Sequence, residues 1–503
     1  MKNTLLPSVL VSLLLLVGCV NHSTSISTSP NIVIIYMDDL GYGELGAYGA
    51  TELKTPNMDR LANGGLRFTQ GHASSATCTP SRFALLTGMY PWKNKRAKVL
   101  PGSASLIIDT SMVTIPKVLK KKGYTTGIVG KWHLGLGSGP INWNERIGPG
   151  PNELGFDSSY ILAATQDRVP TVYIKDGTVV GLDPSDPIEV NYKENFEGEP
   201  TALSNPELLK LNWYDGHNNS IVNGIPRIGF MKGGEKAKWI DEDMADHFLF
   251  KAQEFVKLNK EKPFFLYYAL QQPHVPRTPH PRFVGSTTMG ARGDVIVEAD
   301  WMIGEFLKTL EDEGLMENTL IIFTSDNGPV VNDGYADLSE ELLGDHKPAG
   351  PLRGGKYSMF EAGTRVPFVT YWKGVISPGV SNALVSQIDL LNSLASLVGS
   401  QQTATDSENL MDTFLGKSDL ERESIVLEAS TKTILKKGDW VLIPPYKGPA
   451  FYKMVRIESA NSKDYQLYNI KEDIGQKNDL SEKMPEKLQE MITLYERSTA
   501  DKE

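Results

Sequence analysis

Four short apolar runs, rich in β-branched and aromatic residues, divide the first two thirds of the chain. They are Asn31–Met37, Thr125–Val129, Pro263–Leu270 and Thr319–Thr324. Each run is apolar at nearly every position, which is typical of a strand buried on both faces of a parallel sheet. We therefore predict four central strands over these ranges.

Helical patterns lie between some of these runs. Between about Asp294 and Glu313 the apolar residues fall on one helical face, and Gly314 supplies a C-terminal stop. A second helix is predicted after Asp241, where three acidic residues would occupy the first turn and be favoured by the helix dipole. Strands that alternate with helices predict an α/β fold.

Two stretches depart from this alternation. Residues 135–240 are rich in Gly, Pro and Asn, with one weak hairpin pattern around Asp176-Gly177. Loops of this length in a compact domain are functional or disordered, and we interpret this one as an insertion that recognises the substrate. Residues 401–503 differ from the large domain at 31–400, and we interpret them as a smaller α+β domain. Its predicted elements are the strands Ser424–Leu427, Trp440–Ile443 and Gln466–Asn469 and the helix Met484–Glu496.

Composition places the chain among folded globular proteins. Of its 503 residues, 40% are hydrophobic and 22% are charged. These values exclude a disordered, fibrous or polytopic membrane protein. The net charge of −10, from 61 acidic and 51 basic residues, argues against a general nucleic-acid binder. The two cysteines cannot form a disulfide framework.

The N-terminus has the pattern of an export signal. A positive start is followed by the apolar run Leu5–Val17, which is too short to span a bilayer as a mature helix. Leu16–Cys19 resembles the lipobox of bacterial lipoproteins, so residues 1–19 are interpreted as a lipoprotein signal peptide with its lipobox. This resemblance implies that cleavage leaves Cys19 as the new N-terminus, which carries the lipid. Residues 20–30, rich in Ser and Thr, would form a flexible tether. We expect an exported lipoprotein, periplasmic or surface-exposed, held to the membrane only by its lipid; an ordinary secretory signal is the alternative.

Polar side chains follow each of the four predicted strands. They are Asp38 and Asp39, Lys131 and His133, His274, and Asp326 and Asn327. One such ending alone is equally typical of a turn, but the carboxyl ends of parallel strands meet at one edge of a sheet, where ligands bind. The Asp and Asn oxygens suit Ca²⁺ or Mg²⁺ and disfavour zinc. The alternative is two solvated turns.

Cys78–Arg82 is a second chemical feature. Pro80 fits the first turn of a helix that ends near Gly88. Cys78 would then lie at a helix N-terminus, where free amides form an anion site, and Arg82 would reach the same anion. From its chemistry alone, this segment predicts either a thiolate enzyme or an anion-binding turn.

Together these motifs resemble the signature of the formylglycine-dependent (type I) sulfatases. The resemblance covers roughly residues 31–400 and implies hydrolysis of sulfate esters. It also implies an alkaline-phosphatase-like α/β fold, with a large mixed sheet between helices and a smaller C-terminal α+β domain. The motifs are Cys78–Gly88, Asp38–Gly43, Thr55–Ala62, Gly130–Gly135, Pro273-His274, Ser325–Gly328, Leu352–Lys356 and Glu361–Pro367.

The resemblance implies a modified nucleophile and a metal ion. In the family, a separate maturation enzyme oxidises the motif cysteine, here Cys78, to Cα-formylglycine. The hydrated aldehyde attacks sulfur, and its second hydroxyl then drives release of sulfate by elimination. Asp38, Asp39, Asp326 and Asn327 would hold one Ca²⁺ together with an oxygen of residue 78.

Other residues take their roles by position and charge. Arg82, Lys131 and Lys356 would offset the negative charge on the nucleophile and on the sulfate oxygens. His274, with Lys356, is the expected proton donor to the leaving alcohol, and His133 is the expected base in the elimination. The reverse assignment of the two histidines is the alternative.

Export suggests a large extracellular substrate. The sequence around Cys78 and Asp167–Pro170 resembles that of marine bacterial sulfatases acting on carrageenans, so a sulfated polysaccharide, iota-carrageenan, is the predicted substrate. Arg168, Trp143 and Arg146 are the predicted sugar-binding residues, with core packing as the alternative for Trp143. The basic run Lys93–Lys98 would attract a polyanion, because charge repulsion is screened only beyond about 8–10 Å; solvated surface is its alternative.

Two other functions stay open. The same superfamily includes phosphatases and phosphodiesterases, which need two metal ions and further His or Asp ligands. Asn327 and the cysteine motif argue against that interpretation. A sugar-binding lipoprotein without turnover would result if Cys78 were never converted, but such a binder needs no elimination base.

Overall fold

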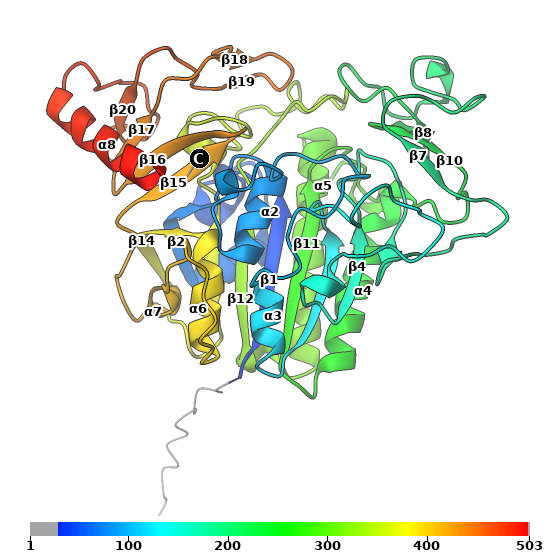
Figure 1. Cartoon of the computed structure of the whole chain (residues 1–503), viewed down its shortest axis with the longest axis horizontal. Helices are drawn as coiled ribbons and strands as arrows, with labels where there is room; N and C mark the ends of the chain where they lie inside the picture. The colour runs from blue at the N-terminus through cyan, green and yellow to red at the C-terminus, as the bar shows by residue number, and fades with distance from the viewer. Residues whose placement is uncertain (1–28, 501–503) are drawn as a thin grey trace, which may run out of the picture.

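The computed structural model describes residues 29–500, and a ten-stranded mixed sheet forms its centre (Figure 1). In spatial order the strands are β14 (Gly379–Ser386), β2 (Leu66–His72), β13 (Phe368–Tyr371), β12 (Thr319–Ser325), β1 (Asn31–Asp38), β11 (Phe264–Pro273), β3 (Thr125–Lys131), β4 (Ser158–Leu162), β5 (Ile174–Lys175) and β6 (Thr178–Val179). The central strands β12, β1, β11, β3 and β4 are parallel to one another.

The four predicted strands are confirmed as β1, β3, β11 and β12. Every residue of β1, β11 and β12 is buried. Continuous burial explains the continuous apolar sequence, because helices cover both faces of a parallel sheet. The predicted α/β class is therefore confirmed.

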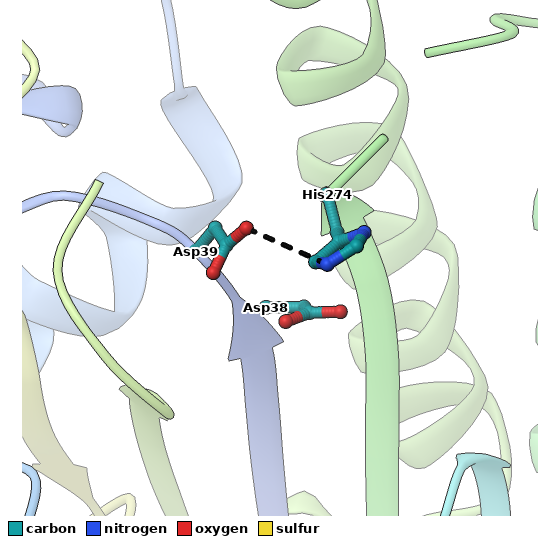
Figure 2. Close-up of side chains that lie close together, drawn as sticks. All are labelled: Asp38, Asp39 and His274. Atoms are coloured by element: carbon teal, nitrogen blue, oxygen red, sulfur yellow. Dashed lines mark ion pairs between the residues drawn. The ribbon is translucent and has the colours of Figure 1, made fainter. Parts of the chain in front are cut away.

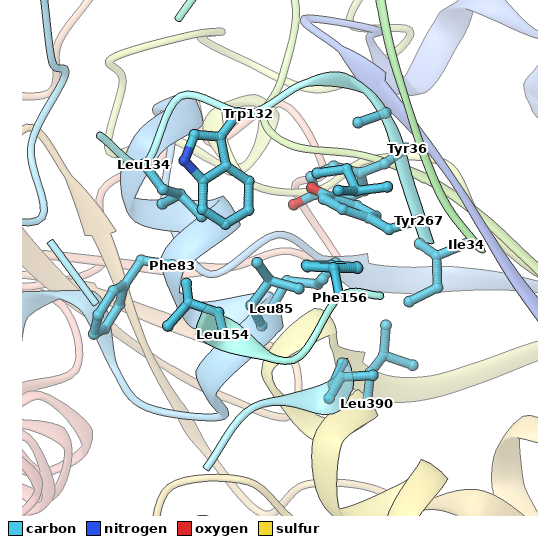
Figure 3. Packing of buried hydrophobic residues seen from close by; sticks show 14 of the residues in the cluster. Ile34, Tyr36, Phe83, Leu85, Trp132, Leu134, Leu154, Phe156, Tyr267 and Leu390 are labelled. Atoms are coloured by element: carbon cyan, nitrogen blue, oxygen red, sulfur yellow. The ribbon is translucent and has the colours of Figure 1, made fainter. Parts of the chain in front are cut away.

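Two hydrophobic cores enclose the sheet, and β1 contributes to both. Ile34 packs in a core with α2, α3 and α6, shown in Figure 3, and its neighbour Ile35 packs on the opposite face with α1, α4 and α5. The bounds of these helices are α1 Pro56–Gly64, α2 Cys78–Thr87, α3 Ile115–Lys120, α4 Met244–Asn259, α5 Gly290–Asp312 and α6 Leu390–Leu397. Between residues 29 and 500, none of the helices has the length and apolar character needed to cross a bilayer.

Residues 135–240 contribute one strand, β4, to the central sheet and otherwise contain short β-pairs joined by loops. The predicted hairpin joins β5 to β6 through Asp176 and Gly177, whose φ angles of 49° and 84° suit a tight hairpin turn. The other pairs are β7 (Glu189–Asn191) with β10 (Phe230–Lys232), and β8 (Ile221–Val222) with β9 (Ile225–Pro226).

The C-terminal region forms a small antiparallel sheet beside the large one (Figure 1). Its elements are α7 (Met411–Phe414), β15 (Ile425–Ala429), β16 (Lys432–Lys437), β17 (Trp440–Ile443), β18 (Phe451–Tyr452), β19 (Ile457–Glu458), β20 (Gln466–Asn469) and α8 (Pro485–Ser498). Of the four strands of this sheet, β16 was not predicted, because three lysines interrupt its apolar pattern.

A buried ion pair joins the small sheet to the segment that leads into β13. Lys436 of β16 donates a hydrogen bond to Glu361 at 3.1 Å, and both side chains are fully buried. Arg365 lies 3.3 Å from the same carboxylate. Burial lowers the pKa of Lys436 to about 8, although Glu361 raises it. The contact therefore depends on keeping the two opposite charges together.

We expect the substitution Glu361→Gln to lower the free energy of unfolding by about 3–5 kcal/mol, because it leaves Lys436 buried without a carboxylate. Urea unfolding followed by circular dichroism measures this loss. The matched control is Glu317→Gln, which removes an exposed pair with Lys373 at 3.2 Å and should cost less than about 1 kcal/mol. Equal losses in the two variants would contradict the assigned role of Glu361.

Candidate active site

The predicted site residues meet at the carboxyl ends of the central parallel strands. Asp38 ends β1, and it lies in register with Pro273 of β11, while Met37 lies in register with Ser325 of β12. The structure brings ten predicted residues together here, each at most 6% exposed: Asp38, Asp39, Cys78, Arg82, Lys131, His133, His274, Asp326, Asn327 and Lys356. Their burial excludes the alternative of two solvated turns.

A change of backbone direction at Asp39 brings two consecutive carboxylates into the site. In a strand, neighbouring side chains point to opposite faces. Asp39 has a φ of 64°, in the left-handed region, so the alternation stops immediately after β1. Both carboxylates therefore face the same site as His274 (Figure 2).

The oxygen atoms of this site fit a hard cation. Asp38 Oδ1 and Asn327 Oδ1 are buried but accept no hydrogen bond, which is costly unless another group satisfies them. Asp39 Oδ1 lies beside them and accepts a hydrogen bond from Asn327 Nδ2 at 2.7 Å. Carboxylate and amide oxygens are the ligands that Ca²⁺ prefers. Ligand atoms of Asp38, Asp39 and His274 also lie within 4.8 Å of one another.

Each carboxylate of the site has one close basic partner. Lys131 Nζ donates to Asp38 Oδ2 at 2.6 Å, and Lys356 Nζ donates to Asp39 Oδ2 at 2.8 Å. The guanidinium of Arg82 donates to Asp326 Oδ2 from Nη2 at 2.7 Å and from Nε at 3.0 Å. The three ion pairs are therefore Asp38 with Lys131, Asp39 with Lys356, and Asp326 with Arg82. Pairing is what permits so many charges to be buried.

Lys356 stays protonated because it contacts two carboxylates. Burial alone would lower the pKa of Lys356, but Asp39 and Asp333 raise it well above its usual value. Asp333 accepts a hydrogen bond from Lys356 Nζ at 3.2 Å. Asp333 is a site residue that was not predicted from the sequence, because Asn332-Asp333-Gly334 has the composition of an ordinary turn.

His133 presents an unprotonated nitrogen to Cys78. Its Nε2 lies 2.9 Å from the carbonyl oxygen of Leu100, which can only accept, so Nε2 carries the hydrogen. Nδ1 is then free to accept, and it lies 3.4 Å from Cys78 Sγ. Burial, and next Lys131, lower the pKa of His133 well below its usual value, so the ring is neutral.

Cys78 itself is a poor thiolate. It is the first residue of α2 and is 1% exposed. Burial raises the pKa of its thiol even though Lys131 and Lys356 lower it. An unmodified thiolate nucleophile is therefore disfavoured.

His274 is an acceptor in this geometry. Its Nδ1 donates to the carbonyl oxygen of Val275 at 2.7 Å, which leaves Nε2 without a hydrogen, 3.8 Å from Asp39. Burial, followed by Lys356 and Lys131, lowers the pKa of His274 well below its usual value. Of the two residues predicted to donate a proton, Lys356 is the one that carries a proton here.

Arg168 lies in the wall of the site with part of its guanidinium free. Its Nη1 donates to Asp167 Oδ1 at 2.9 Å, and Asp167 Oδ2 lies 3.0 Å from His217 Nε2. Within the described residues, Nε and Nη2 of Arg168 have no hydrogen-bond partner. Burial lowers the pKa of Arg168, but Asp167, followed by Tyr192 and Cys78, raises it above its usual value, so the guanidinium is charged and faces residue 78. Its free nitrogens can therefore bind a ligand held over residue 78.

Two predicted sugar-binding residues are corrected by the structure. Trp143 is 3% exposed and packs in the hydrophobic core, so it cannot stack on a sugar. Arg146 lies at the opposite end of the sheet, because Ile147 pairs with Gly177 in the β5–β6 turn, next to the first residues of β4. The sequence of a loop-rich segment does not indicate which end of the sheet its aromatic and basic side chains will reach, so the roles of these two residues could not be predicted.

Known proteins with a similar sequence identify the family of this chain. Residues 30–400 match the protein family described as Sulfatase. The chain is 48% identical over 507 residues to the N-acetylgalactosamine-6-O-sulfatase of Bacteroides thetaiotaomicron, with 99% of each chain covered. It is 32% identical over 405 residues to human arylsulfatase A, covering 80% of this chain and 71% of that protein.

Solved structures agree on the fold. A structure from work on the metabolism of multiple glycosaminoglycans by Bacteroides thetaiotaomicron has a TM-score of 0.93 and 48% identity, covering 94% of this chain and 100% of that one. The structure of Ps i-CgsB in complex with k-i-k-neocarrahexaose has a TM-score of 0.67 but 24% identity, over 94% of both chains, and shares the fold alone. The predicted closeness to carrageenan sulfatases is therefore not supported.

Calcium should raise the thermal unfolding temperature of the protein after dialysis against a chelator, because binding to the folded state alone stabilises it. The variant Asn327→Ala should lose most of this increase, since it removes a free amide oxygen. The control Asp345→Asn removes an exposed carboxylate and should keep the increase. Differential scanning fluorimetry with and without Ca²⁺ measures both, and an unchanged response in Asn327→Ala would rule out this site.

Proposed function

Since this chain belongs to the sulfatase family and is a sulfuric ester hydrolase, we propose that it removes the 6-sulfate of N-acetylgalactosamine in glycosaminoglycan oligosaccharides. The observation that carries the proposal is the 48% identity, across 99% of both chains, to an N-acetylgalactosamine-6-O-sulfatase. A sulfated glycan was the substrate class predicted from the sequence. The specific prediction of iota-carrageenan has only a likeness of fold behind it.

We propose that the site binds one Ca²⁺ and that residue 78 is converted to formylglycine by a separate maturation enzyme. Asp38, Asp39, Asp326 and Asn327 would hold the ion, which supplies positive charge to the sulfate oxygens. Formylglycine supplies a hydroxyl nucleophile at the place of the Cys78 thiol. Burial disfavours the unmodified thiolate, which is consistent with this requirement.

Two residues of the chain would carry out the two proton transfers, one as a base and one as an acid. His133 Nδ1 faces residue 78 and is positioned to take its proton. Lys356 Nζ carries a proton beside Asp39 and is positioned to give it to the oxygen of the leaving sugar. Arg82 and Lys131 stabilise negative charge, and they are fixed in advance by their bonds to Asp326 and Asp38.

The proposed location is outside the cytoplasm. The lipobox at Leu16–Cys19 lies outside the described residues, so lipidation of Cys19 stays a prediction from the sequence. A lipid-anchored hydrolase at the cell surface or in the periplasm would meet oligosaccharides that do not enter the cytoplasm. This setting agrees with a glycan substrate, and the net charge of −10 argues against a general nucleic-acid binder.

The first test is free sulfate released from a panel of substrates. We expect release from 6-sulfated N-acetylgalactosamine and from chondroitin-6-sulfate oligosaccharides, and none from iota-carrageenan fragments or from phosphate esters. The mass of the tryptic peptide 68–82 verifies conversion of residue 78, and the variant Cys78→Ser is the inactive control. Release from carrageenan alone would overturn the proposed substrate, and release of phosphate in place of sulfate would restore the phosphatase alternative.

Arg168 should contribute to sugar binding through its free nitrogens. We expect Arg168→Met to raise KM for the sulfated sugar by roughly tenfold or more, the effect of losing a hydrogen bond to a charged group worth about 1.5–3 kcal/mol. The control Arg146→Met removes the same charge at the far end of the sheet. Steady-state kinetics on the sugar and on a small aryl sulfate separate sugar binding from chemistry. An equal loss on both substrates would contradict a sugar contact.

A further inference from the structure

Three exposed basic residues lie beside the site but outside the reacting groups. Lys95, Arg96 and Lys98 are exposed, while Ala97 between them is buried and fixes the segment. We call these three residues the basic strip. The nearby Lys93 does not belong to it, because it pairs with Asp406 at 2.7 Å.

The basic strip is connected to the site by a short loop. Two residues after Lys98, the carbonyl oxygen of Leu100 accepts the hydrogen bond from His133. Further along, the amide of Gly102 donates to the hydroxyl of Tyr192 at 2.8 Å, and this hydroxyl donates to the carbonyl oxygen of Val169, next to Arg168. At about 3.6 Å per residue, Lys98 lies within about 7 Å of Leu100 along the backbone.

The charges of the strip are available to a ligand. Within residues 29–500, neither Lys95 nor Lys98 pairs with a carboxylate. Arg96 uses Nη2 to bind the carbonyl oxygen of Leu106, which leaves the rest of its guanidinium free. The chain as a whole has a net charge of −10, so an anionic polymer is repelled except where positive charge gathers locally.

We infer that the basic strip binds a second anionic group of an extended sulfated glycan, a sulfate or carboxylate on a sugar other than the one that loses its sulfate. The inference rests on the proposed function and adds a subsite to it. Lys98, two residues from the carbonyl that accepts from His133, can contact a sugar next to the one in the site, and Arg96 and Lys95 extend the positive charge further along the chain. The strip therefore favours oligosaccharides over monosaccharides without changing the chemical step.

The double variant Lys95→Ser/Lys98→Ser tests the strip, since neither side chain has a structural partner to lose. We expect the ratio of KM for a chondroitin-6-sulfate hexasaccharide to KM for 6-sulfated N-acetylgalactosamine to rise about threefold to tenfold, with a weaker dependence on salt. The matched control is Lys121→Ser/Lys122→Ser, which removes two exposed charges before β3, at the amino end of the sheet. The control should leave the ratio unchanged.

An unchanged ratio in the strip variant, or an equal rise in the control, would overturn the subsite. A binding measurement separates this failure from failure of the proposed function. If the parent protein releases no sulfate from these substrates, the proposed function fails. The dissociation constant of the hexasaccharide for Cys78→Ser, with and without the two lysine substitutions, then still tests the strip. A rise of threefold or more supports it, and no rise contradicts it.

Discussion

The site depends on the pairing of buried carboxylates with three cations that are removed from water. Lys131 and Arg82 each hold one carboxylate in place and Lys356 holds two, and none of these groups has appreciable contact with solvent. Buried charges of one sign would drive the strand ends apart, so the pairs are a condition for this part of the fold as well as for the chemistry. The parallel strands carry them to one edge, and both faces of the sheet are covered to keep water out.

Even with this pairing, two side-chain oxygens of the site remain without a hydrogen-bond partner. The cations occupy one oxygen of each aspartate, and the oxygens that stay without a partner are Asp38 Oδ1 and Asn327 Oδ1. The left-handed backbone at Asp39, which costs about 1–3 kcal/mol in such residues, places its carboxylate beside them. Backbone strain and unsatisfied oxygens coincide at the point where a bound cation would compensate for both.

Much of this arrangement could be predicted from the sequence, and the reason is physical. The central strands are apolar at successive positions, so their ends are marked by the first polar residue, and these residues meet because parallel strands end at one edge. Contacts made by loops carry no such signal. Asp333 lies in a turn with ordinary composition, and Trp143 packs in the core from a loop-rich segment. Strand β16 was not predicted because it contains Lys436, a charged residue that is buried only because it pairs with Glu361 from another part of the chain.

The burial of Cys78 determines whether its oxidation can take place before or after the chain folds. A side chain that is 1% exposed at the start of α2 cannot enter the active site of another protein while the fold is intact. An enzyme that oxidises this cysteine must therefore meet the segment before α2 packs against the sheet. The maturation step would precede folding, so the time that the chain spends unfolded would limit the fraction of molecules that become active.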